Sequence, residues 1–122
     1  MSIETIALEF YGEYEGLAVL NLSHTDLYDK EDKGYVEDYL MMHSERLADE
    51  RTKAVVLNFK KLQQYSSAIS GIIISASNFC KKAGYSVACL GEVGNRWERM
   101  HNMLNLDKIA KVYYHLEEVP TS

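Results

Sequence analysis

The residues most able to carry chemistry are two adjacent hydroxyls, Ser66 and Ser67. They lie between a predicted strand, Ala54 to Phe59, and a predicted helix, Ala68 to Ala83. A hydroxyl at a helix start can accept a hydrogen bond from a free backbone N–H, and this purely structural capping role is one interpretation. A phosphate at that position would also meet free N–H groups and the positive end of the helix dipole. The pattern therefore allows a phosphorylation site that the fold would tolerate.

The predicted helix has two distinct faces at about 100° per residue. One face is apolar and should pack on the core; it consists of Ile69, Ile72, Ile73, Ala76, Phe79, Cys80 and Ala83. The opposite face carries Gly71, Ile74, Asn78, Lys81 and Lys82, with Ser70 beside them. Ile74 is thus an apolar residue on an outer face. It is either an isolated exposed side chain or part of a docking surface next to Ser66.

Other residues offer weaker chemistry. The histidines, His24, His43, His101 and His115, show no metal-ligand spacing, and Asp26, Asp29, Glu31 and Asp32 do not follow the EF-hand pattern. The segment 91–96 has two glycines before a helix but lacks the P-loop spacing, so a turn is the better interpretation. Trp97 is expected to pack in or beside the core rather than at an interface. We expect no enzyme, no metal site and no cofactor.

Composition narrows the class of protein. The chain has 122 residues, 47% hydrophobic and 25% charged, which fits one domain over residues 1–122 with a core at about 5–119. Residues 1–52 carry a charge of −9 and residues 53–122 a charge of +4, a distribution that does not favour nucleic-acid binding. We expect no signal peptide and no membrane insertion. Cys80 and Cys89 are expected to be buried thiols in a cytoplasmic protein.

Hydrophobic periodicity predicts the elements that would position the two serines. An initial hairpin is expected from alternation near Ile6 to Phe10 and from the strand Leu17 to Leu22. A helix from Tyr35 to Ala48 should precede the strand 54–59, and Gly84 should end the helix 68–83. Later elements are a strand over 85–90, a helix over 95–104 capped by Asn95, a strand over 109–114 and a short helix at 116–119. The predicted fold class is α/β, a mixed sheet whose later, parallel strands are joined by helices packed on it.

Several segments together resemble the STAS domain, the module of anti-sigma factor antagonists. The resemblance includes Lys53 to Phe59, Tyr65 to Ala68, the helix end Lys82-Ala83-Gly84, Val87 to Gly91, Met103 to Ile109, and Leu116 to Val119. It extends over nearly the whole chain. It implies a STAS-like fold with an N-terminal β-hairpin followed by parallel strands.

The family places a motif like Asp-Ser-Ser-Gly at the start of the second helix, and an anti-sigma factor with serine kinase activity phosphorylates its first Ser. The resemblance therefore implies that Ser66 is the phosphoacceptor and Ser67 its neighbour. The sequence departs from the motif at Tyr65, in place of Asp, and at Ala68, in place of Gly. The implied partner-binding surface consists of Tyr65, Ser66, Ser67, Ala68, Ser70, Gly71, Ile74 and Asn78.

Two roles follow from the resemblance. In the first, the protein binds an anti-sigma factor that is also a serine kinase, and phosphorylation of Ser66 switches that binding. In the alternative, the domain is never phosphorylated and serves as a constitutive scaffold or as the partner of a transporter. The carboxylate that Tyr65 replaces could orient a phosphoacceptor, so this substitution keeps the alternative open.

Overall fold

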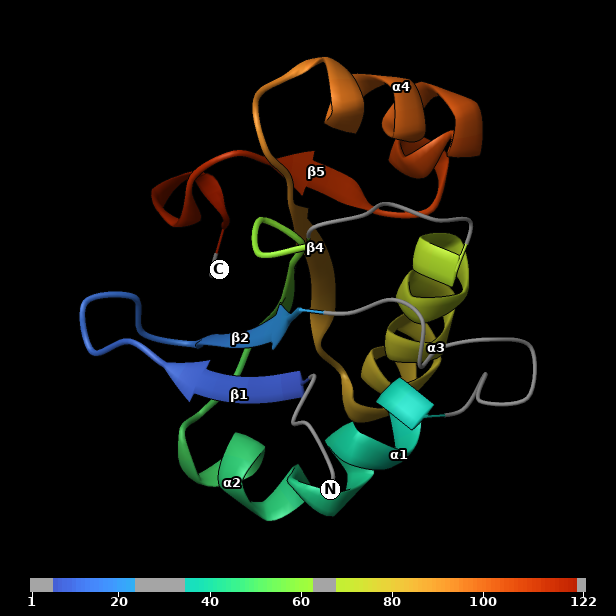
Figure 1. Ribbon diagram of the computed structural model, residues 1–122. Coiled ribbons are helices and arrows are strands. Elements are labelled where there is room, and N and C mark those ends of the chain that lie inside the picture. The colour runs from blue at the N-terminus through green and yellow to red at the C-terminus, as the bar shows by residue number, and fades with distance from the viewer. Residues whose placement is uncertain (1–5, 24–34, 63–67, 121–122) are drawn as a thin grey trace, which may run out of the picture.

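A computed structural model describes residues 6–23, 35–62 and 68–120. Five strands form one sheet in the order β1-β2-β3-β4-β5, so spatial order follows sequence order (Figure 1). The strands are β1 (Ile6–Phe10), β2 (Leu17–Leu22), β3 (Ala54–Asn58), β4 (Ser86–Leu90) and β5 (Lys111–Tyr113). The helices are α1 (Tyr35–Met42), α2 (Ser44–Asp49), α3 (Ala68–Ala83) and α4 (Asn95–Leu104), with short 3-10 turns η2 (Leu106–Lys108) and η3 (Leu116–Glu118).

The sheet is mixed, as predicted. β1 and β2 form an antiparallel hairpin in which Leu8 lies opposite Leu20. β2, β3, β4 and β5 are mutually parallel, with Val19 opposite Val56 and Leu57 opposite Cys89. Helices connect the parallel strands, because parallel neighbours need a crossover connection. The α/β class with an N-terminal hairpin is therefore confirmed.

One face of the sheet carries the main core. Ala18, Leu20, Val55, Leu57 and Cys89 project from the strands into a cluster that also holds the buried residues of the helices α1 to α4. The apolar face predicted for α3 is buried in this cluster, except that Ala83 in its last turn is exposed. Ala83 lies at the end of the helix, where the sheet and the neighbouring helices no longer cover it.

The opposite face of the sheet is covered mainly by the C-terminal segment. Leu17, Val19, Val56 and Leu90 pack there under residues that include Val119, and the partly buried Tyr11, Tyr14, Tyr113 and Leu116 surround them. Figure 1 shows the C-terminal end of the chain to the left of β4 and above β2. β2 is consequently buried along its whole length, on both faces.

The helix predicted over residues 35–48 is divided in two, so that prediction was wrong at His43. The backbone of His43 leaves helical geometry (φ −105°, ψ 17°), and its N–H donates to the carbonyl of Leu40 in a tighter turn. Its Nδ1 lies 2.9 Å from the carbonyl oxygen of Tyr39. A ring nitrogen near a backbone carbonyl competes with the regular helical ladder, and the chain turns there into α2.

Helix ends and the last strand test four further predictions. Gly84 ends α3 as predicted: it has a positive φ of 84°, and the N–H of Tyr85 donates to the carbonyl of Cys80. Asn95 is not the cap of α4, because it is the first helical residue and Gly94 occupies the N-cap without a side-chain hydrogen bond. The strand predicted over 109–114 is shorter, only Lys111–Tyr113, because the N–H groups of Ile109 and Ala110 both donate to the carbonyl of Leu106 in the preceding 3-10 turn. The closing helix predicted at 116–119 is the 3-10 turn η3.

None of the helices in the described part of the chain is long and apolar enough to span a membrane.

Candidate functional site

The predicted site is centred on the start of α3. Tyr65, Ser66 and Ser67 lie in residues 63–67, outside the described residues, so the predicted phosphoacceptor stays a prediction. The structure does define both ends of that segment: Leu62 precedes it and Ala68 opens the 16-residue helix α3.

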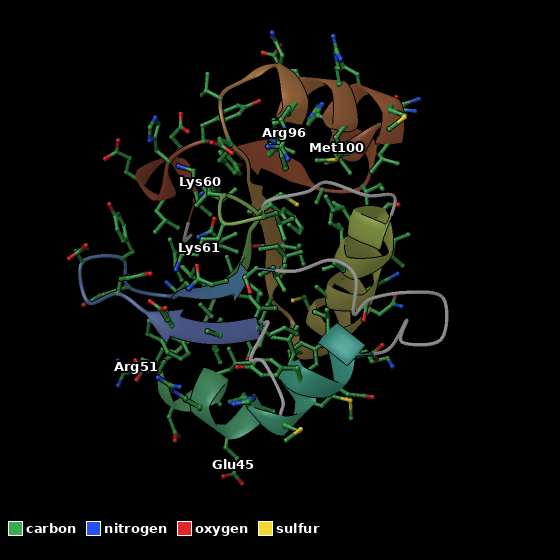
Figure 2. The ribbon with its side chains drawn as sticks, viewed as in Figure 1. Glu45, Arg51, Lys60, Lys61, Arg96 and Met100 are labelled. Carbon is green, nitrogen blue, oxygen red and sulfur yellow. The ribbon has the colours of Figure 1, made fainter. Side chains whose placement is uncertain are left out.

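The chain is firmly held where it leaves β3. Phe59 and Leu62 are buried, and the N–H of Phe59 donates to the carbonyl of Leu90. The N–H of Lys60 donates to the Oδ1 of Asn58 at 3.0 Å. The segment carrying Ser66 therefore begins from a fixed point on the sheet, next to the exposed Lys60 and Lys61 (Figure 2).

The outer face of α3 holds the described part of the predicted partner-binding surface. Gly71 and Asn78 are exposed, and Ser70 is partly buried. Ile74 is 50% exposed although it lies in a helix whose other isoleucines are buried. A β-carbon built at Gly71 would meet nothing within 4 Å, so the surface beside Ile74 is open. Gly71, Ile74 and Asn78 recur at spacings of three and four residues and form one stripe, which we call the α3 stripe.

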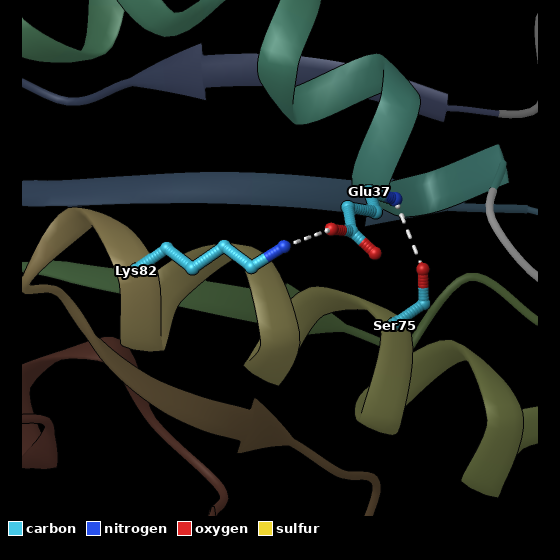
Figure 3. A network of polar contacts seen from close by, with 3 residues as sticks. All are labelled: Glu37, Ser75 and Lys82. Atoms are coloured by element: carbon cyan, nitrogen blue, oxygen red, sulfur yellow. Dashed lines mark hydrogen bonds and ion pairs between the residues drawn. The ribbon is translucent and has the colours of Figure 1, made fainter.

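Two polar contacts connect helix α1 with helix α3 (Figure 3). The backbone N–H of Glu37, in the first turn of α1, donates to the Oγ of the buried Ser75 at 3.0 Å. The carboxylate of Glu37 also lies 3.5 Å from the ammonium of Lys82. The first few N–H groups of a helix lack partners in their own helix, so Ser75 satisfies one of them from a neighbouring helix. These contacts fix the position of α3 beside α1.

Sequence analysis missed a polar network on the sheet face opposite the helices. The Nδ2 of Asn58 donates to the Oδ1 of Asn21 at 2.7 Å, across the β2–β3 pairing that places these residues side by side. Lys60 Nζ donates to the carbonyl of Tyr114. An asparagine at the same register of two otherwise apolar strands was the available signal. The network joins the start of the Ser66 segment to β2 and to the chain after β5.

The side chain of Glu118 holds the turn that follows β5. Its Oε1 accepts hydrogen bonds from the N–H groups of Tyr114 and His115, both at 3.0 Å. These two backbone donors favour the charged carboxylate and lower the pKa of Glu118.

Trp97 belongs to the core, as predicted. It is almost fully buried, with its ring centroid 6.1 Å from that of Phe59. The ring lies directly against Gly91, where a β-carbon would overlap it. Gly91 thus permits close packing of α4, labelled at Arg96 and Met100 in Figure 2, on the end of β4.

The described residues offer no candidate metal centre. They contain no group of three or more His, Cys, Asp or Glu side chains able to hold a metal, and the acidic residues Asp26 to Asp32 lie outside them. Cys80 and Cys89 are free, buried thiols, as predicted, and burial raises the pKa of each to about 12. A thiol with so high a pKa is a poor nucleophile.

Comparison with known proteins shows which solved structures share this fold. No family model matches the sequence, and no curated protein matches it. Among solved structures, a candidate anti-sigma factor antagonist of Thermotoga maritima is similar, with a TM-score of 0.63 and 16% identity over 94% of this chain and 91% of that one. The anti-sigma factor antagonist SpoIIAA, solved in its unphosphorylated form, gives a TM-score of 0.57 and 12% identity over 93% and 91%. The chain thus has the fold of these antagonists.

Proposed function

We propose that this chain, which shares its fold with anti-sigma factor antagonists, is a regulatory protein-binding module of the same kind. Its partner would be an anti-sigma factor with serine kinase activity. Binding would free the sigma factor that the partner holds. We expect a cytoplasmic location and no catalytic activity of its own.

The exposed α3 stripe is the observation that carries this proposal. A single exposed isoleucine is ordinary, but Ile74 lies between the exposed Gly71 and Asn78, in the first half of the helix. Small neighbours let a partner approach the helix closely, and a half-exposed isoleucine supplies apolar area for the contact. Ser75 and Glu37 hold the helix in place beneath it, so the surface is preformed.

Phosphorylation of Ser66 would switch that binding. A phosphate adds close to two negative charges and would lie near the start of the 16-residue helix α3. The helix dipole stabilises an anion there, so the fold should remain intact while the charge beside the α3 stripe changes. A partner contacting Ile74 would then meet a doubly charged group about two turns away along the helix.

The alternative is a constitutive partner that is never phosphorylated, either in a scaffold or beside a transporter. Tyr65 is the residue that favours it, because a tyrosine stands where a carboxylate would lie next to the acceptor hydroxyl. Binding through the α3 stripe is common to both proposals, and they differ only at Ser66.

One experiment tests the switch. The purified chain is incubated with ATP and each anti-sigma serine kinase of its source organism, and its intact mass is measured. We expect one added phosphate in wild type, an unchanged mass in Ser66→Ala, and one phosphate in the control Ser77→Ala, a serine further along α3. Complex formation with no mass change would establish the constitutive alternative. The absence of both binding and phosphate with every such kinase would contradict the antagonist role.

A further inference from the structure

A groove of about 680 Å³ opens between the β1–β2 turn and the end of α2. Its walls come from residues 10–17 on one side and from residues 46–53 on the other. β2 and β3 begin at this edge of the sheet, whereas α3 starts after the other end of β3, so the groove and the start of α3 lie at opposite edges (Figure 1). The volume is within the range of pockets that hold small molecules.

Three cations line the groove: Arg46, Arg51 and Lys53. None of them forms an ion pair with a carboxylate in the described part of the chain. The stem of Lys53 runs along Gly16, within 3.4 Å of where a β-carbon would stand, and this contact holds Lys53 against the turn. Three cations around one hollow, none paired with a carboxylate among the described residues, offer N–H donors to an anionic group.

Aromatic rings form part of the wall. Phe10, Tyr11 and Tyr14 all line the groove, and the guanidinium of Arg46 stacks 4.9 Å from the centroid of Phe10. A stacked guanidinium keeps the N–H donors at its edge available for an anion. The rings themselves offer flat apolar surface to a ligand. Glu15, Asp49 and Glu50 also line the groove and balance its three cations in number, so they would oppose a ligand with several negative charges.

The backbone at Arg51 is the second, independent observation. Its φ is 56°, in the left-handed region where glycine is favoured. The N–H of Arg51 donates to the carbonyl of Ala48, and the N–H of Thr52 to that of Leu47, which makes a Schellman motif at the end of α2. The equivalent turn after α3 has Gly84, with φ 84°. Arginine thus occupies a position where glycine would be more stable, and strain of this kind is commonly found at functional sites.

We propose that this groove binds a small aromatic anion, a flat ring carrying one phosphate or carboxylate group. Arg51 and Lys53 hold the anionic group, assisted by Arg46, and the ring lies against Tyr14. The left-handed backbone at position 51 thus accommodates an arginine, rather than the glycine favoured there, in the lining of the groove. The site is separate from the α3 stripe and does not depend on the partner proposed for it.

Amide NMR titration tests this site with phenyl phosphate and with benzoate. We expect saturable shifts at Gly16, Arg51 and Lys53 with at least one of them, and the tighter of the two identifies the preferred anionic group. Inorganic phosphate and benzyl alcohol, which each lack one half of the ligand, should bind at least about tenfold more weakly. Arg51→Gly should lower the affinity for the aromatic anion by a similar factor. It should also raise the midpoint of urea unfolding, because glycine adopts the left-handed backbone without strain.

Asn105→Gly is the matched control, since Asn105 also has a left-handed backbone (φ 51°) but lies at the end of α4. It should leave the titration unchanged. Lys53→Gln, which keeps the stem over Gly16, should weaken binding without altering the turn. The proposal is overturned if neither aromatic anion shifts the groove amides saturably, if Arg51→Gly binds as wild type does, or if inorganic phosphate binds equally well.

Discussion

The Oγ of Ser75 lies 3.0 Å from the backbone nitrogen of Glu37 and accepts its hydrogen, although the two residues are 38 positions apart. Ser75 is buried in α3, and Glu37 is in the first turn of α1. This hydrogen bond connects two helices and fixes the orientation of α3, and with it the surface around Ile74.

Ser75→Ala should lower the free energy of unfolding by about 1–2 kcal/mol, because the N–H of Glu37 loses its partner in a partly buried setting. Urea denaturation followed by circular dichroism measures the change. Ser77→Ala, two residues away and only partly buried, should change stability by less than about 0.5 kcal/mol. Equal effects of the two substitutions would show that the hydrogen bond contributes nothing specific.

Lys82→Met should have little effect on stability, in contrast to Ser75→Ala. The side chain of Lys82 is 79% exposed and its ammonium lies 3.5 Å from the carboxylate of Glu37, and ion pairs at the surface contribute less than about 1 kcal/mol. Denaturation at low and high salt checks this, since a weak surface pair gives a small, salt-sensitive difference. A salt-independent loss comparable to that of Ser75→Ala would contradict it.

Two glycines should respond to alanine in opposite directions. A β-carbon at Gly91 overlaps the ring of Trp97, so Gly91→Ala should destabilise by about 1–3 kcal/mol and alter tryptophan fluorescence. A β-carbon at Gly71 meets nothing, and Gly71→Ala should stabilise α3 by about 0.5–1 kcal/mol. Thermal unfolding of both variants measures the signs, and a Gly91→Ala protein as stable as wild type would contradict the close packing of Trp97.

The two cysteines predict how stability varies at high pH. Burial raises the pKa of Cys80 and of Cys89 to about 12 in the folded state, above the value of about 8.5 for a free thiol. The stabilisation linked to these protonated thiols is therefore complete below about pH 8.5 and should be lost as pH rises toward 12. A thiol reagent at pH 8 should react only as fast as the protein unfolds. Rapid labelling of the folded protein would contradict the burial of these thiols.

Much of the fold follows from sequence periodicity, and the exceptions have tertiary causes. The buried face of α3 was predictable because six apolar residues recur with helical spacing and meet the sheet. The break at His43 was not predictable, since it depends on a local contact with the carbonyl of Tyr39. The left-handed backbone of Arg51 was also not predictable, because positions with this conformation favour glycine and the sequence has arginine there.

The candidate site was predicted only in part, for the same reason. Ile74 stood out because an apolar residue interrupts a polar helix face, and its exposure is confirmed. The hydrogen bond between Ser75 and Glu37 joins distant segments, and no local pattern indicates which helices become neighbours. The phosphoacceptor Ser66 lies outside the described residues and stays a prediction.

The affinity of the α3 stripe for an anti-sigma serine kinase tests the central claim most directly. Titration calorimetry should compare wild type with Ile74→Asp and with the control Met103→Asp, which changes a more exposed apolar residue on α4. We predict that Ile74→Asp weakens binding by about tenfold or more, with unfolding unchanged, because a charge replaces apolar contact area. Met103→Asp should bind as wild type does. Equal affinity of the Ile74→Asp and wild-type proteins would contradict the claim that this surface binds the partner.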